Sequence, residues 1–201
     1  EKPWKSVPVA SITLSNIAEL RKAFDPKLVK QALDRSIRTA AERVRTQISR
    51  DVRERYNIKA GDIGKAVTLR AVNSDGVLQR LLVYTGGRIS LARFGARPRV
   101  VRGGKRKYTG VTVQVLKSEG RQMVKGGFLA KGRNAKEDTP QQIFQRTGDS
   151  RLPIRKLTGP AIPTMVGNKL IIAKANDTAG DVLQKEFTRQ MGLLMDKTGA
   201  L

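Results

Sequence analysis

The 201-residue sequence contains neither cysteine nor histidine. Without cysteine the chain cannot form disulfides or thiolate sites, and it fits a reducing cytosol. Without histidine it lacks the commonest general base and the commonest metal ligand. Ser150 has no Gly-x-Ser-x-Gly context, and Gly103-Gly104-Lys105 lacks the upstream glycine of a phosphate-binding loop, because Arg99 stands there. We therefore expect no enzymatic activity, no cofactor and no metal.

Aromatic residues and long apolar runs are also scarce. The chain has five Phe, three Tyr and one Trp, and 39% of its residues are hydrophobic, which makes a thin core for this length. We expect one compact unit with extended loops or arms that become ordered against neighbours. No run of about 18 apolar residues occurs, so neither a membrane span nor a membrane partner is predicted.

Carboxylates are few, and one long stretch has none. The sequence holds 40 Lys and Arg against 17 Asp and Glu, a net charge of +23. Between Asp75 and Glu119 there are ten basic residues and no acid. This imbalance favours polyanions or acidic protein surfaces as partners. No zinc-finger spacing or RNA-binding signature indicates base-specific recognition.

The basic residues of this stretch are densest in a predicted loop at residues 95–109. A loop of this length inside a compact domain is usually functional or disordered, and Tyr108 offers a ring on which a base could stack. Two interpretations stay open: contact with a polyanion or acidic surface, which the missing carboxylates favour, and a solvated loop without specific contacts. The candidate contact residues are Arg97, Arg99, Arg102, Lys105, Arg106 and Lys107.

Apolar periodicity predicts a long first helix. Asp25 is its expected N-cap and Pro26 its first helical residue, and apolar residues recur at three- and four-residue steps to about Tyr56. Its arginine-rich face is interpreted as an exposed or inter-subunit face rather than a nucleic-acid groove. Two arginines have a carboxylate four positions earlier: Asp34–Arg38 and Asp51–Arg55.

A second helix is predicted at 178–195. Its apolar stripe is expected to be core, although residues 193–195 could instead cover a neighbouring subunit. Residues 60–64 are expected to form a break with a short helical turn. Strands are predicted at 68–72, 77–84, 89–94, 110–116, 123–130 and 142–147. Residues 166–172 are expected to form a bridge that leads to the second helix.

The turn residues at 73–76 predict that the first two strands form a hairpin. The expected fold class is α+β: a mainly antiparallel sheet flanked by a long N-terminal helix and a C-terminal helix, with extended loops or arms. We expect an arm or strand at 1–24 and a single domain at 25–201.

Residues 151–163 combine three prolines with apolar side chains. Each proline fixes φ and removes a hydrogen-bond donor, which excludes a helix. We therefore predict a bent, extended strap. Leu152, Ile154, Leu157 and Ile162 are expected to point inward, while Arg151, Arg155 and Lys156 stay in solvent.

The strap resembles the lambda-type prophage minor tail protein Z family, whose members carry Arg-Leu-Pro-Ile followed by Gly-Pro-small-aliphatic-Pro. Residues 89–95, 126–130 and 143–147 resemble further segments of that family in the same order. The resemblance spans roughly residues 30 to 198 and leaves 1–24 without a counterpart. The motif residues, in structural roles, are Phe94, Gly95, Phe128, Arg151, Leu152, Pro153, Ile154, Gly159, Pro160, Ile162 and Pro163.

The resemblance implies a tail-completion protein, a structural virion protein at the head-proximal end of a bacteriophage tail. It further implies a ring, commonly a hexamer, in the neck region of the virion, assembled in the host cytoplasm. The implied partners are further copies of the chain and the tail terminator, tail tube or connector proteins, with genomic DNA in the lumen as another candidate.

A ring of chains that each carry +23 repels itself unless acidic neighbours or DNA compensate the charge. Such neighbours are therefore expected. The composition leaves a second function open: a free-standing protein that binds nucleic acid without sequence preference.

Overall fold

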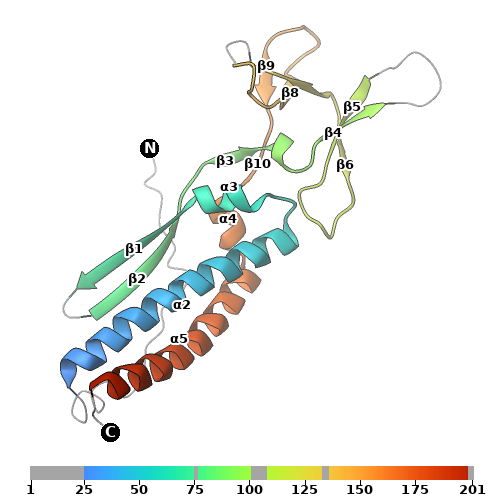
Figure 1. Cartoon of the computed structure of the whole chain (residues 1–201). Helices are drawn as coiled ribbons and strands as arrows, with labels where there is room; N and C mark the ends of the chain where they lie inside the picture. The colour runs from blue at the N-terminus through green and yellow to red at the C-terminus, as the bar shows by residue number, and fades with distance from the viewer. Residues whose placement is uncertain (1–24, 75–76, 101–107, 133–135, 199–201) are drawn as a thin grey trace. The chain divides into compact units, whose positions relative to one another are not determined.

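The protein is an α+β structure, as predicted, with a long N-terminal helix, a C-terminal helix and antiparallel strands (Figure 1). The strands of the described residues are divided among four small antiparallel sheets. The computed structural model describes residues 25–74, 77–100, 108–132 and 136–198. The predicted arm or strand at 1–24 lies outside these residues.

Contacts within the chain divide it into two compact units. The helical unit comprises the described residues up to Arg50 together with 67–84 and the residues from Val166 onward. The sheet unit comprises 51–66 and the described residues of 85–165. The expectation of a single domain over 25–201 stays a prediction.

The helical unit consists of two long helices and a hairpin. Its elements are α2 (Pro26–Arg55), of which the last residues belong to the sheet unit, β1 (Val67–Ser74), β2 (Val77–Tyr84) and α5 (Lys169–Thr198). Helix α2 begins as predicted, because Asp25 Oδ1 accepts a hydrogen bond from the Lys27 amide at 2.9 Å. The predicted hairpin is also confirmed, with Val67 opposite Tyr84 and Ser74 opposite Val77.

Helix α5 begins at Lys169, earlier than the predicted start at residue 178, and so includes part of the bridge expected at 166–172. The Asn168 Oδ1 accepts a hydrogen bond from the Leu170 amide at 3.1 Å and so caps the helix. From there Ile171, Ala175, Ala179 and Leu183 are buried at four-residue spacing. Burial of this stripe outweighs the strand preference of Ile171 and Ile172.

Helices α2 and α5 run antiparallel and share one core, with the hairpin packed beside them (Figure 1). Val29, Ala32 and Leu33 from the start of α2 pack against Met191 and Leu194 from the end of α5. Leu78 of β2 adds to the same cluster. The apolar stripe of α5 is therefore core, as expected, although Leu193 is 44% exposed.

The sheet unit holds the remaining described elements. Its three sheets have the strand orders β4-β5-β6, β7-β8-β9 and β10-β3. Val111 and Val113 of β5 and Ile143 of β8 are buried together between the two larger sheets. The elements are α3 (Ala60–Lys65), β3 (Arg88–Ser90), the 3-10 helix η1 (Leu91–Arg93), β4 (Arg97–Val100), β5 (Tyr108–Val113), β6 (Gln122–Val124), β7 (Gly127–Ala130), β8 (Gln142–Arg146), β9 (Ile154–Lys156), β10 (Thr158–Ala161) and α4 (Ile162–Val166).

Several predicted boundaries in this unit change. The strand predicted at 89–94 ends at Ser90, whose Oγ accepts a hydrogen bond from the Ala92 amide at 3.4 Å and starts η1. The strand predicted at 123–130 is broken by a turn into β6 and β7, which belong to different sheets. The helical turn expected at 60–64 is confirmed as α3.

The strap is extended over β9 and β10, but its end is helical. Ile162 and Pro163 begin α4, so the prediction that 151–163 contains no helix is wrong at that end. Proline is tolerated there because the first turn of a helix needs no amide donor. Ile162 is buried and Leu157 is half-buried, as expected, whereas Leu152 and Ile154 are 68% and 40% exposed rather than inward.

Candidate interaction surfaces

Two motifs that lie far apart in the sequence meet in the sheet unit. The pairing of β3 with β10 places Ser90 opposite Thr158, which brings Phe94 onto Gly159. The Phe94 side chain is fully buried, and a Cβ at position 159 would lie 2.6 Å from its ring carbon Cε2. Only glycine leaves room for this ring. The Phe-Gly and Gly-Pro motifs are therefore two halves of one packing contact.

Gly95 turns the chain from η1 into β4. Its φ of +63° is a left-handed conformation that favours glycine, and the Asn57 side-chain nitrogen lies 2.7 Å from where a Cβ would be. The strand that follows places Arg97 and Arg99 on the sheet. The predicted loop at 95–109 is thus corrected: its first part is β4, paired with β5.

One face of the β4–β5–β6 sheet is core and the other carries cations. Pro98, Val111 and Val124 lie opposite one another in the register, and Val111 is fully buried. Because neighbouring residues of a strand point to opposite faces, Arg97 and Arg99 lie on the other face. There Arg97 is opposite Thr112, which is opposite Met123.

The outer face is basic and partly apolar. Arg97 and Arg99 are exposed, Met123 is 42% exposed, and Arg99 Nη1 lies 3.0 Å from the Met123 sulfur. Arg97 forms no ion pair with any described residue. Between Asp75 and Glu137 the sequence contains a single acid, Glu119, whose Oε2 accepts a hydrogen bond from Gln122 Nε2 at 3.0 Å.

Arg121 belongs to the same face and was missed by the sequence analysis. Its Nε donates to Thr112 Oγ1 at 3.3 Å, and Nη2 donates to the Thr112 carbonyl at 2.9 Å and to the Gly95 carbonyl. These bonds hold an exposed guanidinium across the end of the sheet. No sequence signal marks this arginine, because only the register of β5 and β6 brings it beside Arg97. We call Arg97, Arg99 and Arg121 the basic sheet face.

The other predicted contact residues cannot be placed. Arg102, Lys105, Arg106 and Lys107 lie outside the described residues, and only the backbone of Tyr108 is described, in β5. Their prediction as contact residues stays a prediction.

The second sheet explains the remaining motif residues. Phe128 of β7 is opposite Phe144 of β8, and their ring centroids are 6.3 Å apart. Edge strand β9 pairs with β8, with Arg155 opposite Gln145. The Arg155 guanidinium donates to Gln145 Oε1 at 2.7 and 3.2 Å. Arg151, Arg155 and Lys156 are exposed, as expected.

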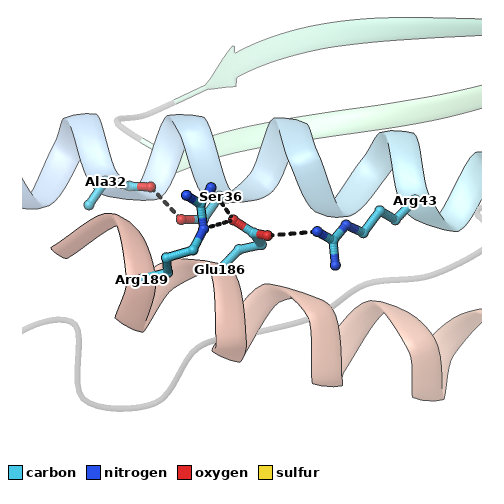
Figure 2. A network of polar contacts seen from close by, with 5 residues as sticks. All are labelled: Ala32, Ser36, Arg43, Glu186 and Arg189. Carbon is cyan, nitrogen blue, oxygen red and sulfur yellow. Dashed lines mark hydrogen bonds and ion pairs between the residues drawn. The ribbon is translucent and has the colours of Figure 1, made fainter. Parts of the chain in front are cut away.

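In the helical unit the cations next to the core meet carboxylates of the chain itself. The Glu186 side chain is only 6% exposed and lies between Arg43 at 3.0 Å and Arg189 at 2.8 Å (Figure 2). Seven residues before Arg43 on α2, the fully buried Ser36 donates from Oγ to the Ala32 carbonyl at 2.6 Å (Figure 2).

The pair expected between Asp34 and Arg38 on α2 is replaced by two others. Asp34 pairs with Arg80 of the hairpin at 2.6 Å, and the exposed Arg38 pairs with Glu42 at 3.5 Å instead. Asp51 is buried. The carboxylate of Asp34 thus fastens the hairpin to α2.

Other kinds of site find no support in the described part of the chain. No group of three or more potential metal ligands occurs among these residues. The described helices include none that is long and apolar enough to cross a membrane. On the helical unit, Lys30, Gln31, Asp34, Arg35 and Leu78 line an open depression.

Comparison with known proteins decides the family. The model of the family described as Prophage minor tail protein Z (GPZ) matches residues 10–197. The chain belongs to this family. It is therefore a minor tail protein of the bacteriophage type, a structural component of a tail.

The family match begins earlier than the resemblance seen in the sequence. It includes residues 10–24, so the statement that 1–24 has no counterpart is wrong for most of that segment. Comparisons with curated proteins and with solved structures found no match.

Proposed function

We propose that this minor tail protein completes the head-proximal end of the tail as a non-enzymatic, ring-forming part of the head–tail interface. The observation that carries the proposal is the match to the minor tail protein Z family over residues 10–197. The charge of the chain supports it, because a protein with a net charge of +23 needs compensating neighbours when its copies come together.

The two units take different parts in this proposal. The helical unit provides the body, since its cations next to the core have carboxylate partners in the chain. The basic sheet face provides the contact, since the sequence around it contains a single acid over more than fifty residues. Its partners are the tail terminator, the tail tube or the connector, with DNA in the lumen as a further contact. We expect the ring to have sixfold symmetry.

Deletion of the gene for this chain from the prophage tests the function. We expect filled heads and separately assembled tails that do not join into infectious particles, and recovery when the purified chain is added to the extract. A particle reconstruction should then show its density in the neck. Infectious yield that is unchanged without the chain, or density elsewhere in the particle, would contradict the proposal.

A second function is favoured by one observation, the acid-free stretch between Asp75 and Glu119, which includes Arg97 and Arg99 of the basic sheet face. A free-standing nucleic-acid coat would bind any duplex as a monomer, and its affinity would fall steeply with salt because counterions are released from the phosphates. Such binding by the monomer, together with normal tail completion in its absence, would favour this second function over the tail role.

A further inference from the structure

We propose that the outer edge of β9 is a docking site for an extended acidic segment of a different protein, which adds to the β7–β8–β9 sheet as a fourth strand. This site is separate from the basic sheet face, and it extends the proposed function without depending on it.

The register of β9 leaves one edge of the strand open. The Thr147 amide donates to the Pro153 carbonyl at 3.1 Å, and the Leu157 amide donates to the Ile143 carbonyl at 2.9 Å. Because main-chain groups alternate in direction along a strand, Arg155 also faces β8, while the amides and carbonyls of Ile154 and Lys156 face away. No described strand pairs on that side. An unpaired row of donors and acceptors is a template for strand addition.

Exposed apolar side chains lie beside the outer edge of β9. Leu152 and Ile154 are 68% and 40% exposed, although their sequence predicts burial. Ile154 is opposite Arg146 and therefore on the same face as Phe144, which is half-buried against Phe128. The aromatic pair and Ile154 thus form an apolar strip that reaches the edge. A neighbouring strand would cover it.

The charge around the edge selects an acidic partner. Arg146, Arg151, Arg155 and Lys156 are exposed and form no ion pair with described residues. Asp149 is the single acid between Asp138 and Asp177. A second copy of the chain is disfavoured, because like charges across two adjacent strands repel.

The outward carbonyls of β9 favour a peptide rather than a nucleic acid as the partner. The carbonyls of Ile154 and Lys156 need donors, and a phosphate backbone offers acceptors only. Nor would phosphates cover Leu152 and Ile154. A peptide strand supplies donors, acceptors and apolar side chains together. The partner is therefore a strand in which Glu or Asp alternates with Val, Ile or Leu.

The test uses the full chain and a defined probe, the capped peptide Glu-Val-Glu-Ile-Glu-Val-Glu. Hydrogen exchange followed by NMR should show that the peptide slows exchange at the Ile154 and Lys156 amides by about tenfold or more, the effect of adding a hydrogen bond. The Arg155 amide, which already bonds to β8, should change little. The same peptide methylated on its main-chain nitrogens should not protect them.

A pair of variants separates the main chain from the charge. Lys156→Pro removes the outward amide as well as the cation, while Lys156→Ala removes the cation alone. Proline is tolerated here because the lost amide does not bond to β8. We expect Lys156→Pro to bind the peptide about five- to tenfold more weakly than Lys156→Ala, the effect of one hydrogen bond. Unfolding curves check that both variants are folded.

Four results would overturn the proposal. The first two are failure of the acidic peptide to protect the Ile154 and Lys156 amides, and binding of the methylated peptide as tight as that of the unmethylated one. The third is equal affinity of the two Lys156 variants for the peptide. The fourth is protection of the same amides by a DNA duplex, or by a higher concentration of the chain alone.

Discussion

The two units of this molecule handle positive charge in different ways. In the helical unit, Glu186 lies between Arg43 and Arg189, and Asp34 joins Arg80, so these cations help to hold the fold. The sheet unit has one such pair, Arg93 with Asp62, beside apolar contacts such as Phe94 on Gly159. The arginines of its basic sheet face lie instead in a nearly acid-free stretch.

This difference teaches how to interpret a highly basic chain. The net charge of +23 is a sum over cations with two different roles. Those with carboxylate partners in the chain contribute to stability, and those without remain available to other molecules. The predictions below separate the two roles.

The largest expected loss of stability follows from removing the Phe94 ring from the apolar contact of the sheet unit. Phe94→Ala should lower the free energy of unfolding by about 3–5 kcal/mol, because it empties a fully buried site. Urea unfolding measures it. Phe144→Ala is the matched control, since Phe144 is only half-buried and its loss should cost clearly less. Equal losses would show that the Phe94–Gly159 contact does not hold this unit.

A buried tyrosine makes the stability of the helical unit depend on pH. Burial raises the pKa of Tyr84 to about 12, against a smaller opposing effect of the Arg45 charge. Between about pH 10 and 12 the unfolded chain therefore ionises this group while the folded chain does not. Its contribution to stability is complete below pH 10 and is lost as the pH rises, by about 2 kcal/mol.

Tyr84→Phe should remove this loss. The Tyr84 hydroxyl has no hydrogen-bond partner among the described residues, so the substitution should be close to neutral at pH 7. Unfolding free energies of both proteins between pH 8 and 12 give the comparison, and lysine ionisation cancels because it is common to both. Parallel pH profiles would contradict the burial of this hydroxyl.

Removal of the shared carboxylate should have a smaller effect. Glu186→Gln keeps the size of the side chain but leaves Arg43 and Arg189 without their anion. Both arginines are more than half exposed, so the loss should be about 1–2 kcal/mol rather than the full cost of breaking a buried pair. Thermal or urea unfolding measures it. An unchanged stability would mean that this unit does not depend on its internal ion pairs.

Local patterns predicted the elements whose signals lie close together in sequence. The cap at Asp25, the apolar stripe of α2 and the hairpin all follow from neighbouring residues. The start of α5 was missed because residues 166–172 were interpreted as a bridge, whereas Asn168 caps the helix and the buried stripe runs from Ile171 to Leu183.

The composition of the candidate surfaces could not be fully predicted, because it depends on pairing between strands that are distant in sequence. Arg97 and Arg99 were predicted as contact residues, but Arg121 joins them only through the register of β5 with β6. Exposure of Leu152 and Ile154 was not predicted, because the face of an edge strand is fixed by its partner and not by its own sequence. Likewise, the motif residues Phe94 and Gly159 are brought into contact only by the pairing of β3 with β10.

Tail completion by two charge-matched variants tests the central claim most directly. One replaces Arg97, Arg99, Arg102, Arg106 and Lys107 by Ala, and the other replaces Lys30, Arg35, Arg38, Arg45 and Arg50, which are exposed on α2. Both lose five positive charges, and both should keep the stability of the parent within about 1 kcal/mol. In extracts that lack the chain, we predict that the α2 variant restores infectious particles and the first variant does not. Equal restoration by the two would contradict the claim that the cations in and around the basic sheet face, rather than those exposed on α2, act in assembly.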